Sequence, residues 1–265
     1  MKSYCSADHA NACQDIPRPV SALSVNFSPG TIDKRHTHRR AQLLYACSGV
    51  MSVLTDTDAF VVPPMRALWL PAGTAHEVHY RGRVCLRTLY IEPHATPTLP
   101  SYCCVIEVSD LLRALIVEAT RVPIEYDVAG RDGDIISLIL REITAMPIAS
   151  PPLPLPADPR LMRICRAILA KPADDASLED WARSASMSRA TLVRLFSRET
   201  GMSFIAWRQQ ARLVEAMSRL DAGHSITRVA FEVGYRSPST FTALFRRSFG
   251  LTPRQYSALP ATSRR

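Results

Sequence analysis

The sequence of 265 residues contains no run of about 18 consecutive apolar residues, the length that a helix needs to cross a bilayer. Its first 20 residues are polar, and they lack the apolar stretch of about 7–15 residues that a secretory signal peptide requires. We therefore expect a cytoplasmic protein that does not contact a membrane, and whose residues 1–20 form a flexible tail.

Cysteines are few, and their spacing excludes two kinds of site. The seven cysteines are odd in number and irregularly spaced, and no two of them form a Cys-x-x-Cys pair. This excludes the spacing of a zinc ribbon and of a thioredoxin-like redox motif. In a reducing compartment such cysteines are expected to be free thiols, several of them buried. A redox-sensing cysteine is the alternative.

Acidic residues are scarce in one half of the chain only. Residues 157–265 contain 18 Lys and Arg against 9 Asp and Glu, whereas residues 1–156 contain 14 against 15. A basic excess that is confined to one half predicts a polyanionic partner for that half. Nearly all of this positive charge is arginine, whose planar guanidinium suits phosphate oxygens and the edge of guanine.

A proline-rich segment divides the chain, because five prolines lie within residues 147–156. Neither a helix nor a central strand tolerates this density, so residues 147–157 are predicted to form an extended linker. Before it, residues 21–95 contain short β-branched and aromatic runs that predict a small barrel or sandwich. Residues 96–146 contain two stretches with helical apolar spacing, which would pack on the barrel or form the seam of a homodimer. The expected strands are residues 42–46, 50–55, 59–62, 67–70 and 84–91, and the expected helices are residues 109–121 and 132–145.

Beyond the linker, residues 158–258 have a helical pattern that repeats, and residues 259–265 form a short tail. Residues 177–201 can be laid over residues 225–250 with one inserted residue in the turn. Each copy predicts a helix that begins after a capping serine, a tight turn, and a second serine-capped helix that ends at a glycine. This arrangement places a recognition helix in the major groove of DNA. A long amphipathic helix over residues 203–220 would join the two copies as a rigid spacer.

The second helix of each copy has a face that is predicted to contact DNA. In the first copy, Arg194 is placed to contact guanine, whereas Arg189 and Arg198 suit phosphate. The second copy offers a weaker reading surface and would mainly position the DNA backbone. The predicted contacts are Arg189, Ala190, Val193, Arg194 and Arg198 in the first copy and Ser239, Thr242, Arg246 and Arg247 in the second.

Residues 234–256, which read GYRSPSTFTALFRRSFGLTPRQY, closely resemble the signature of AraC/XylS-type regulators. The resemblance extends over about residues 160–258. It implies a DNA-binding module with two recognition helices, double-stranded promoter DNA as its target and RNA polymerase as a further partner. It also favours activation over repression. Ala190 and Ala243 stand where many relatives carry large reading side chains.

Histidines mark the N-terminal half. His36 and His38 would share one face of a strand, and Gln42 keeps the same parity if the strand is unbroken. A third histidine from another strand, His76, would complete the set. Neutral imidazoles with an oxygen donor suit a divalent transition metal such as iron, nickel, zinc, manganese or copper. Without a metal, His36, His38, Gln42 and His76 would line a pocket for a small-molecule effector.

Residues 30–49 and 71–76 resemble the paired motifs of the cupin barrel. Gln42 stands where the first motif has an acidic residue, and Met65 and Tyr80 stand where the second has Gly and Asn. Regulators of the AraC type often carry such a barrel as their sensing domain. The expected fold is therefore an α+β multidomain chain: a cupin-like β-barrel with a helical hairpin, followed by an all-α domain with two helix-turn-helix units.

The resulting prediction is a bacterial transcription regulator, not an enzyme, that is controlled by a small-molecule or metal effector in the barrel. Metal-holding cupin barrels also include oxygenases and isomerases, but no paired carboxylates accompany these histidines. A nucleoid protein that binds DNA without discriminating sequence is a third possibility. Arg35, Arg39 and Arg40 flank the histidine pair, either as contacts for an anionic effector or as a solvated rim.

Overall fold

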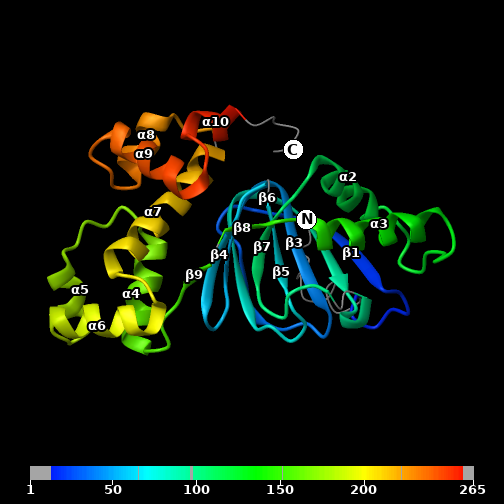
Figure 1. Cartoon of the computed structure of the whole chain (residues 1–265), viewed down its shortest axis with the longest axis horizontal. Coiled ribbons are helices and arrows are strands. Elements are labelled where there is room, and N and C mark those ends of the chain that lie inside the picture. Colours follow the sequence, from blue (N-terminus) through cyan, green and yellow to red (C-terminus); the bar gives the residue numbers. More distant parts are fainter. Residues whose placement is uncertain (1–12, 65, 96–97, 151, 222, 259–265) are drawn as a thin grey trace. The chain divides into compact units, whose positions relative to one another are not determined.

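The computed structural model describes residues 13–64, 66–95, 98–150, 152–221 and 223–258, so that Met65 and the predicted tail at residues 259–265 lie outside the described residues. The chain divides into two compact units, and among these residues the first holds 13–55 and 60–150 and the second 56–59 and 152–258. The first is built on a β-sheet and the second on helices (Figure 1). Within the described residues, none of the helices combines the length and the apolar character that spanning a membrane requires.

Two long antiparallel strands form the centre of the sheet. β3 pairs with β6 from Ala41↔Ile91 to Leu54↔Glu77, with an irregular register between Ala46 and Val50. The path of the sheet is β1-β6-β3-β5-β7-β8, with β2 also paired to β6 and β4 to β3. The strands are β1 (Val20–Phe27), β2 (Ile32–His36), β3 (Ala41–Leu54), β4 (Asp58–Val62), β5 (Arg66–Leu70), β6 (His76–Ile91), β7 (Cys104–Glu107), β8 (Ile148–Ser150) and β9 (Leu153–Pro154), with a short 3-10 helix, η1, at Pro93–Ala95.

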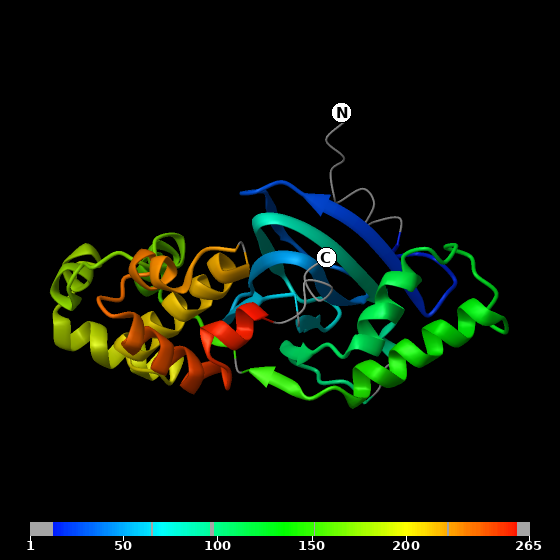
Figure 2. The ribbon, with the colours of Figure 1, turned by 90° about the horizontal axis from the view of Figure 1, so that it is seen from above.

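The sheet is buried on both faces. Helices α2 (Asp110–Ala119) and α3 (Arg131–Ala145) lie side by side and cover one face (Figure 1, Figure 2). Before the irregular register of β3, odd residues such as Leu43 enter the core beneath these helices. Even residues, such as Leu44, enter a second core on the other face. Because successive side chains of a strand alternate, this double burial explains the continuous apolar run at residues 43–47.

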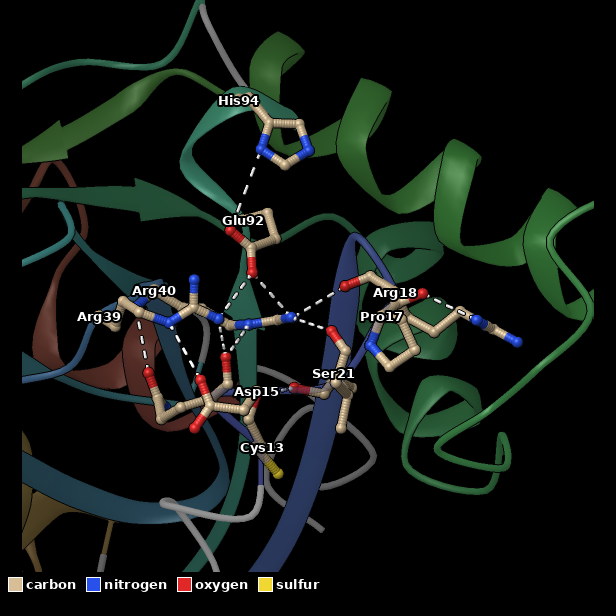
Figure 3. A network of polar contacts seen from close by, with 11 residues as sticks. Cys13, Asp15, Pro17, Arg18, Ser21, Arg39, Arg40, Glu92 and His94 are labelled. Atoms are coloured by element: carbon tan, nitrogen blue, oxygen red, sulfur yellow. Dashed lines mark hydrogen bonds and ion pairs between the residues drawn. The ribbon is translucent and has the colours of Figure 1, made fainter.

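The segment before β1 is anchored by a buried arginine. The Arg40 guanidinium donates to the main-chain oxygens of Gln14 (3.0 Å), Ile16 (2.6 Å) and Arg18 (3.0 Å), and it pairs with Glu92 at 2.8 Å (Figure 3). Residues 13–20 therefore do not form the flexible tail that the sequence predicted, because their carbonyl groups satisfy this guanidinium. Both readings of Arg40 were wrong as well, since its side chain is neither a solvated rim residue nor free to contact an effector.

The proline-rich segment is extended, as predicted, but it also pairs with strands. β8 lies at the end of the sheet path beside β7, and β9 pairs with β4 through Asp58↔Pro154 and Ala59↔Leu153. Proline has no N–H to donate, so it is tolerated on an edge strand although not in a central one. The segment therefore forms short edge strands instead of an unpaired connector.

The second unit contains two small helical cores that share one long helix. At the start of α7, Phe204 and Trp207 pack against Phe196 of α6, with ring centroids 5.3 and 5.8 Å apart. Near its end, Leu213 belongs to a different core, with Phe241 of α9. The helices are α4 (Pro159–Ala170), α5 (Leu178–Ser184), α6 (Arg189–Thr200), α7 (Phe204–Asp221), α8 (Ile226–Glu232), α9 (Pro238–Phe249) and α10 (Pro253–Ala258).

Candidate functional site

Three histidines from separate segments meet in the first unit. His36 is the last residue of β2, and it lies opposite His76, the first residue of β6. The main-chain oxygen of His38 accepts a hydrogen bond from the amide of Gly73 at 2.8 Å, so the two segments that resemble cupin motifs touch each other. One ring nitrogen from each of the three histidines lies within 4.8 Å of the other two.

The prediction that His36, His38 and Gln42 lie on one face of a single strand was wrong. β2 ends at His36, so His38 lies in the following turn, and Gln42 lies on the next strand, β3. Gln42 is buried and donates from Nε2 to Thr88 Oγ1 at 3.1 Å. Its partner across the sheet is Tyr90, whose ring packs edge-on against His38 with centroids 5.0 Å apart. The turn and the strand pairing, and not a shared strand face, bring Gln42 and the histidines to one region.

Main-chain carbonyl groups orient two of the rings. His36 Nδ1 lies 2.6 Å from the oxygen of Lys34, and His76 Nδ1 lies 2.9 Å from the oxygen of Thr74. Each Nδ1 must therefore carry the proton, which leaves the lone pair on Nε2. His38 Nε2 lies 3.1 Å from His36 Nε2, whereas His76 Nε2 is buried without a hydrogen-bond partner in the described chain.

Two of the three rings, those of His38 and His76, are in the neutral form that binds a metal ion. Burial, followed by the charges of the neighbouring imidazoles, lowers the pKa of His38 to about 3. Burial is also the main cause that lowers the pKa of His76 to about 4. Both rings are neutral near pH 7, and Gln42 Oε1 is a buried oxygen with no hydrogen-bond partner among the described residues. The donor set of three imidazoles and one amide oxygen thus fits a divalent transition metal or a small molecule rich in hydrogen-bond donors.

In the second unit, α5 and α6 form the first helix-turn-helix. Ser177 and Asp180 make the predicted capping box at the start of α5. Ser188 caps α6 by accepting from the Thr191 amide, and Gly201 ends that helix in the left-handed conformation. The predicted DNA contacts on α6 are all exposed: Arg189, Ala190, Val193, Arg194 and Arg198.

Helices α8 and α9 repeat this plan. Ser225 caps α8 and Ser237 caps α9, with Pro238 in its first turn. Gly234 turns the chain between them with a φ of 87°. On α9, Ser239, Arg246 and Arg247 are exposed and Thr242 is half-buried.

The exposed arginines of α6 and α9 differ in whether they form ion pairs within the protein. Arg189 pairs with Glu179 at 2.9 Å, and Arg198 lies 3.5 Å from Glu199. Within the described residues the side chains of Arg194, Arg246 and Arg247 make no ion pair or hydrogen bond. These three are therefore available to a polyanion without first breaking a contact in the protein.

Two further arginines, Arg208 and Arg212, were missed by the sequence reasoning. They lie on α7, where both donate hydrogen bonds to main-chain carbonyl groups of other segments. The only sequence signal was their spacing of four residues, which places both on one side of a helix.

Two family models match this chain, one in each of its two units. Residues 181–258 match the family described as "Helix-turn-helix domain", and residues 28–122 match "AraC-like ligand binding domain". The HTH-type transcriptional regulator NimR of Escherichia coli is 31% identical over 223 residues, which cover 84% of this chain and 81% of NimR. The HTH-type transcriptional regulator RipA of Corynebacterium glutamicum is 38% identical over 110 residues, 42% of this chain and 33% of RipA. The solved structure of ToxT from Vibrio cholerae aligns with a TM-score of 0.38 and 11% identity, covering 91% of this chain and 98% of ToxT.

Proposed function

Because the chain belongs to the AraC-type family of helix-turn-helix transcriptional regulators, we propose that it binds promoter DNA in a sequence-specific way under the control of an effector in its first unit. The observation that supports this most is the repeated helix-turn-helix, in which two serine-capped helices each present unpaired arginines. The proposal includes activation as the outcome of binding, with RNA polymerase as a partner.

The two recognition helices have unequal tasks in this proposal. Arg194 reads guanine, because its guanidinium is exposed and unpaired in the middle of α6. Arg189 and Arg198 contact phosphates from the flanks of that helix, beside Ala190 and Val193. On α9, Arg246 and Arg247 with Ser239 and Thr242 mainly position the DNA backbone.

Competition binding tests this part of the proposal. Sites are selected by the full chain from a random pool of duplex DNA, and the affinity for a selected site is compared with that for unrelated DNA at one salt concentration. A sequence-specific regulator should prefer its site by about 10³-fold or more. Equal affinity for both would instead indicate a protein that binds DNA without discriminating sequence.

The effector site is proposed to be the cluster of His36, His38, His76 and Gln42. The buried, unpartnered Nε2 of His76 and Oε1 of Gln42 support it, because a buried polar atom without a partner is costly unless a ligand satisfies it. The three imidazoles would hold a divalent metal, which would act as the effector itself or as an anchor for a chelating small molecule. The carbonyl groups that accept from Nδ1 of His36 and His76 would keep both rings oriented.

Metal analysis of the purified, tag-free protein tests this site. A double variant His36→Ala/His38→Ala is measured beside the control His79→Ala, whose ring pairs with Glu77 outside the cluster. One metal per chain that persists in the control and disappears in the double variant would support a metal-centred sensor. Absence of metal from all three proteins would leave a small-molecule pocket, to be tested by screening organic effectors for their effect on binding of the selected DNA.

A homodimer is proposed through the outer surface of helices α2 and α3. Leu111 on α2 is 49% exposed and Leu138 on α3 is 39% exposed, although both helices bury their other faces against the sheet. Two such helices packed against their copies would cover these leucines. Leu138→Arg should shift the sedimentation of the protein from dimer to monomer, whereas Ser137→Arg, at the neighbouring exposed position, should have less effect.

A further inference from the structure

The two helix-turn-helix units depend on α7 for their mutual orientation. The start of α7 packs with the first helix-turn-helix through Phe204 and Trp207, and its second half packs with the second helix-turn-helix through Leu213 and Met217. A helix that connects two separate cores leaves each of them able to twist or tilt about the junction unless something else connects them. The junction lies between residues 208 and 212.

Arg212 makes such a connection with a single guanidinium. Its Nε donates to the oxygen of Pro172 at 2.9 Å and its Nη2 to the oxygen of Asp174 at 3.0 Å. Both carbonyls belong to the loop that leads from α4 into the first helix-turn-helix. Its Nη1 donates to the oxygen of Gly234 at 3.1 Å, in the turn of the second helix-turn-helix. The planar group thus joins backbone atoms of the two helix-turn-helix units.

The fit around this guanidinium is tight. A Cβ at Gly234 would lie 3.0 Å from Arg212 Cζ and 3.3 Å from Ala173 Cα. The turn of the second helix-turn-helix, the loop that enters the first and the Arg212 guanidinium therefore meet at one point. At Gly250, which also has a positive φ, a Cβ would meet no atom within 4 Å. Gly201 and Gly223 likewise meet no atom, so among the positive-φ glycines described in this helical part of the chain the close approach occurs at the turn that faces Arg212.

Arg208, one helical turn earlier, provides a natural comparison. It donates to the oxygens of Ala176 and Asp174, which both lie in the loop that enters the first helix-turn-helix. The two arginines thus share the Asp174 carbonyl, but of the two only Arg212 extends to the second helix-turn-helix. Replacing Arg212, but not Arg208, should therefore abolish any effect that depends on joining the two helix-turn-helix units.

We propose that Arg212 is a positioning residue that fixes the orientation of the two helix-turn-helix units and thereby sets the separation of the two DNA half-sites. The inference rests on the proposed function, in which both recognition helices engage one duplex about one turn apart, roughly 34 Å. One inserted base pair rotates one half-site by roughly 34° and moves it by about 3.4 Å. A rigid pair of readers cannot follow that change, whereas a loosely joined pair can.

The test measures how strongly binding depends on half-site spacing. A site selected by the full-length protein from a random duplex pool is remade with one base pair inserted or removed between its halves. For the wild type, each change should weaken binding about tenfold or more, as for a lost base contact. For Arg212→Ala and Arg212→Lys, the same changes should weaken binding by no more than about threefold, because neither side chain can hold three carbonyl groups in one plane. Arg208→Ala should keep the wild-type spacing dependence.

Each outcome decides the proposal. An Arg212 variant that shows cooperative thermal unfolding and retains the tenfold spacing dependence would overturn it. Loss of the dependence in Arg208→Ala would also overturn it, because loosening the loop would then suffice. Should Arg212→Ala fail to fold, Arg212→Lys, which keeps a donor at this position, supplies the measurement. If the wild type prefers no selected site over unrelated DNA, the proposed function itself fails, whereas a preferred site that lacks a second half, or whose spacing Arg212 does not control, overturns only the present proposal.

Discussion

Arg40 and Glu92 form an ion pair with a nitrogen–oxygen distance of 2.8 Å, in which the arginine side chain is 0% exposed and the glutamate side chain 15% exposed. The same guanidinium accounts for three carbonyl groups of the segment before β1. A charge this deeply buried is tolerated only while its partners remain in place. The pair therefore holds residues 14–18 on the sheet.

Replacing Arg40 by Met should destabilise the first unit by about 3–5 kcal/mol, because it removes the buried donor of three main-chain carbonyl groups and one of the two arginine partners of the Glu92 carboxylate. Native-state hydrogen exchange of the amides of β1 and β6 measures the loss directly. The control is Arg39→Met, since the Arg39 side chain is 55% exposed and should contribute no more than about 1 kcal/mol. Equal losses in the two variants would contradict the structural role of Arg40.

Gln42→Glu should increase the affinity of the histidine cluster for divalent metal. Gln42 presents a buried amide oxygen without a partner, and a carboxylate in its place adds a charged ligand beside neutral imidazoles. Titration with Zn²⁺ against a competing chelator should show binding tightened by about tenfold or more. Glu77→Gln, a change outside the cluster, serves as the control. Unchanged or weaker binding in Gln42→Glu would argue against Gln42 as part of a metal site.

Arg194→Ala and Arg198→Ala should weaken DNA binding in different ways. Loss of the unpaired Arg194 should cost about 1–3 kcal/mol on the selected site and relax the preference at one base pair. Loss of Arg198 should weaken all sequences alike and reduce the dependence of binding on salt concentration. Binding to a panel of single-base variants of the selected site separates the two effects. Sequence-independent losses from both variants would remove the assignment of Arg194 to base reading.

Gly234→Ala should destabilise the second helix-turn-helix more than Gly250→Ala. Both glycines have a positive φ, so alanine at either position costs about 1–2 kcal/mol of backbone strain. At Gly234 the added methyl group must also displace Arg212 or the backbone at Ala173, which adds about 1–3 kcal/mol. Urea-dependent hydrogen exchange of amides in α8 and α9 measures both. Similar losses would mean that the turn and the loop adjust freely around Arg212.

Local features of the helical unit could be predicted from the sequence. Ser177, Ser188, Ser225 and Ser237 cap the predicted helices, since capping is decided by the side chain and the next three amides. In the sheet, β1 and β7 were not predicted, the strand expected through His36 and His38 ends at His36, and two predicted strands merged into β3. Strand pairing joins residues far apart in the chain, which a local pattern does not specify.

The residues of both proposed sites could be read from local patterns: which histidines stand at cupin-like offsets, and which arginines follow a capping serine on a helix. Only the tertiary structure decided that His38 lies in a turn beside His76, that Arg40 is an anchor, and that Arg212 joins the two helix-turn-helix units. The physical reason is the range of the interactions. Caps and helix faces depend on neighbours within four residues, whereas a buried guanidinium finds its partners among carbonyl groups that only folding brings within reach.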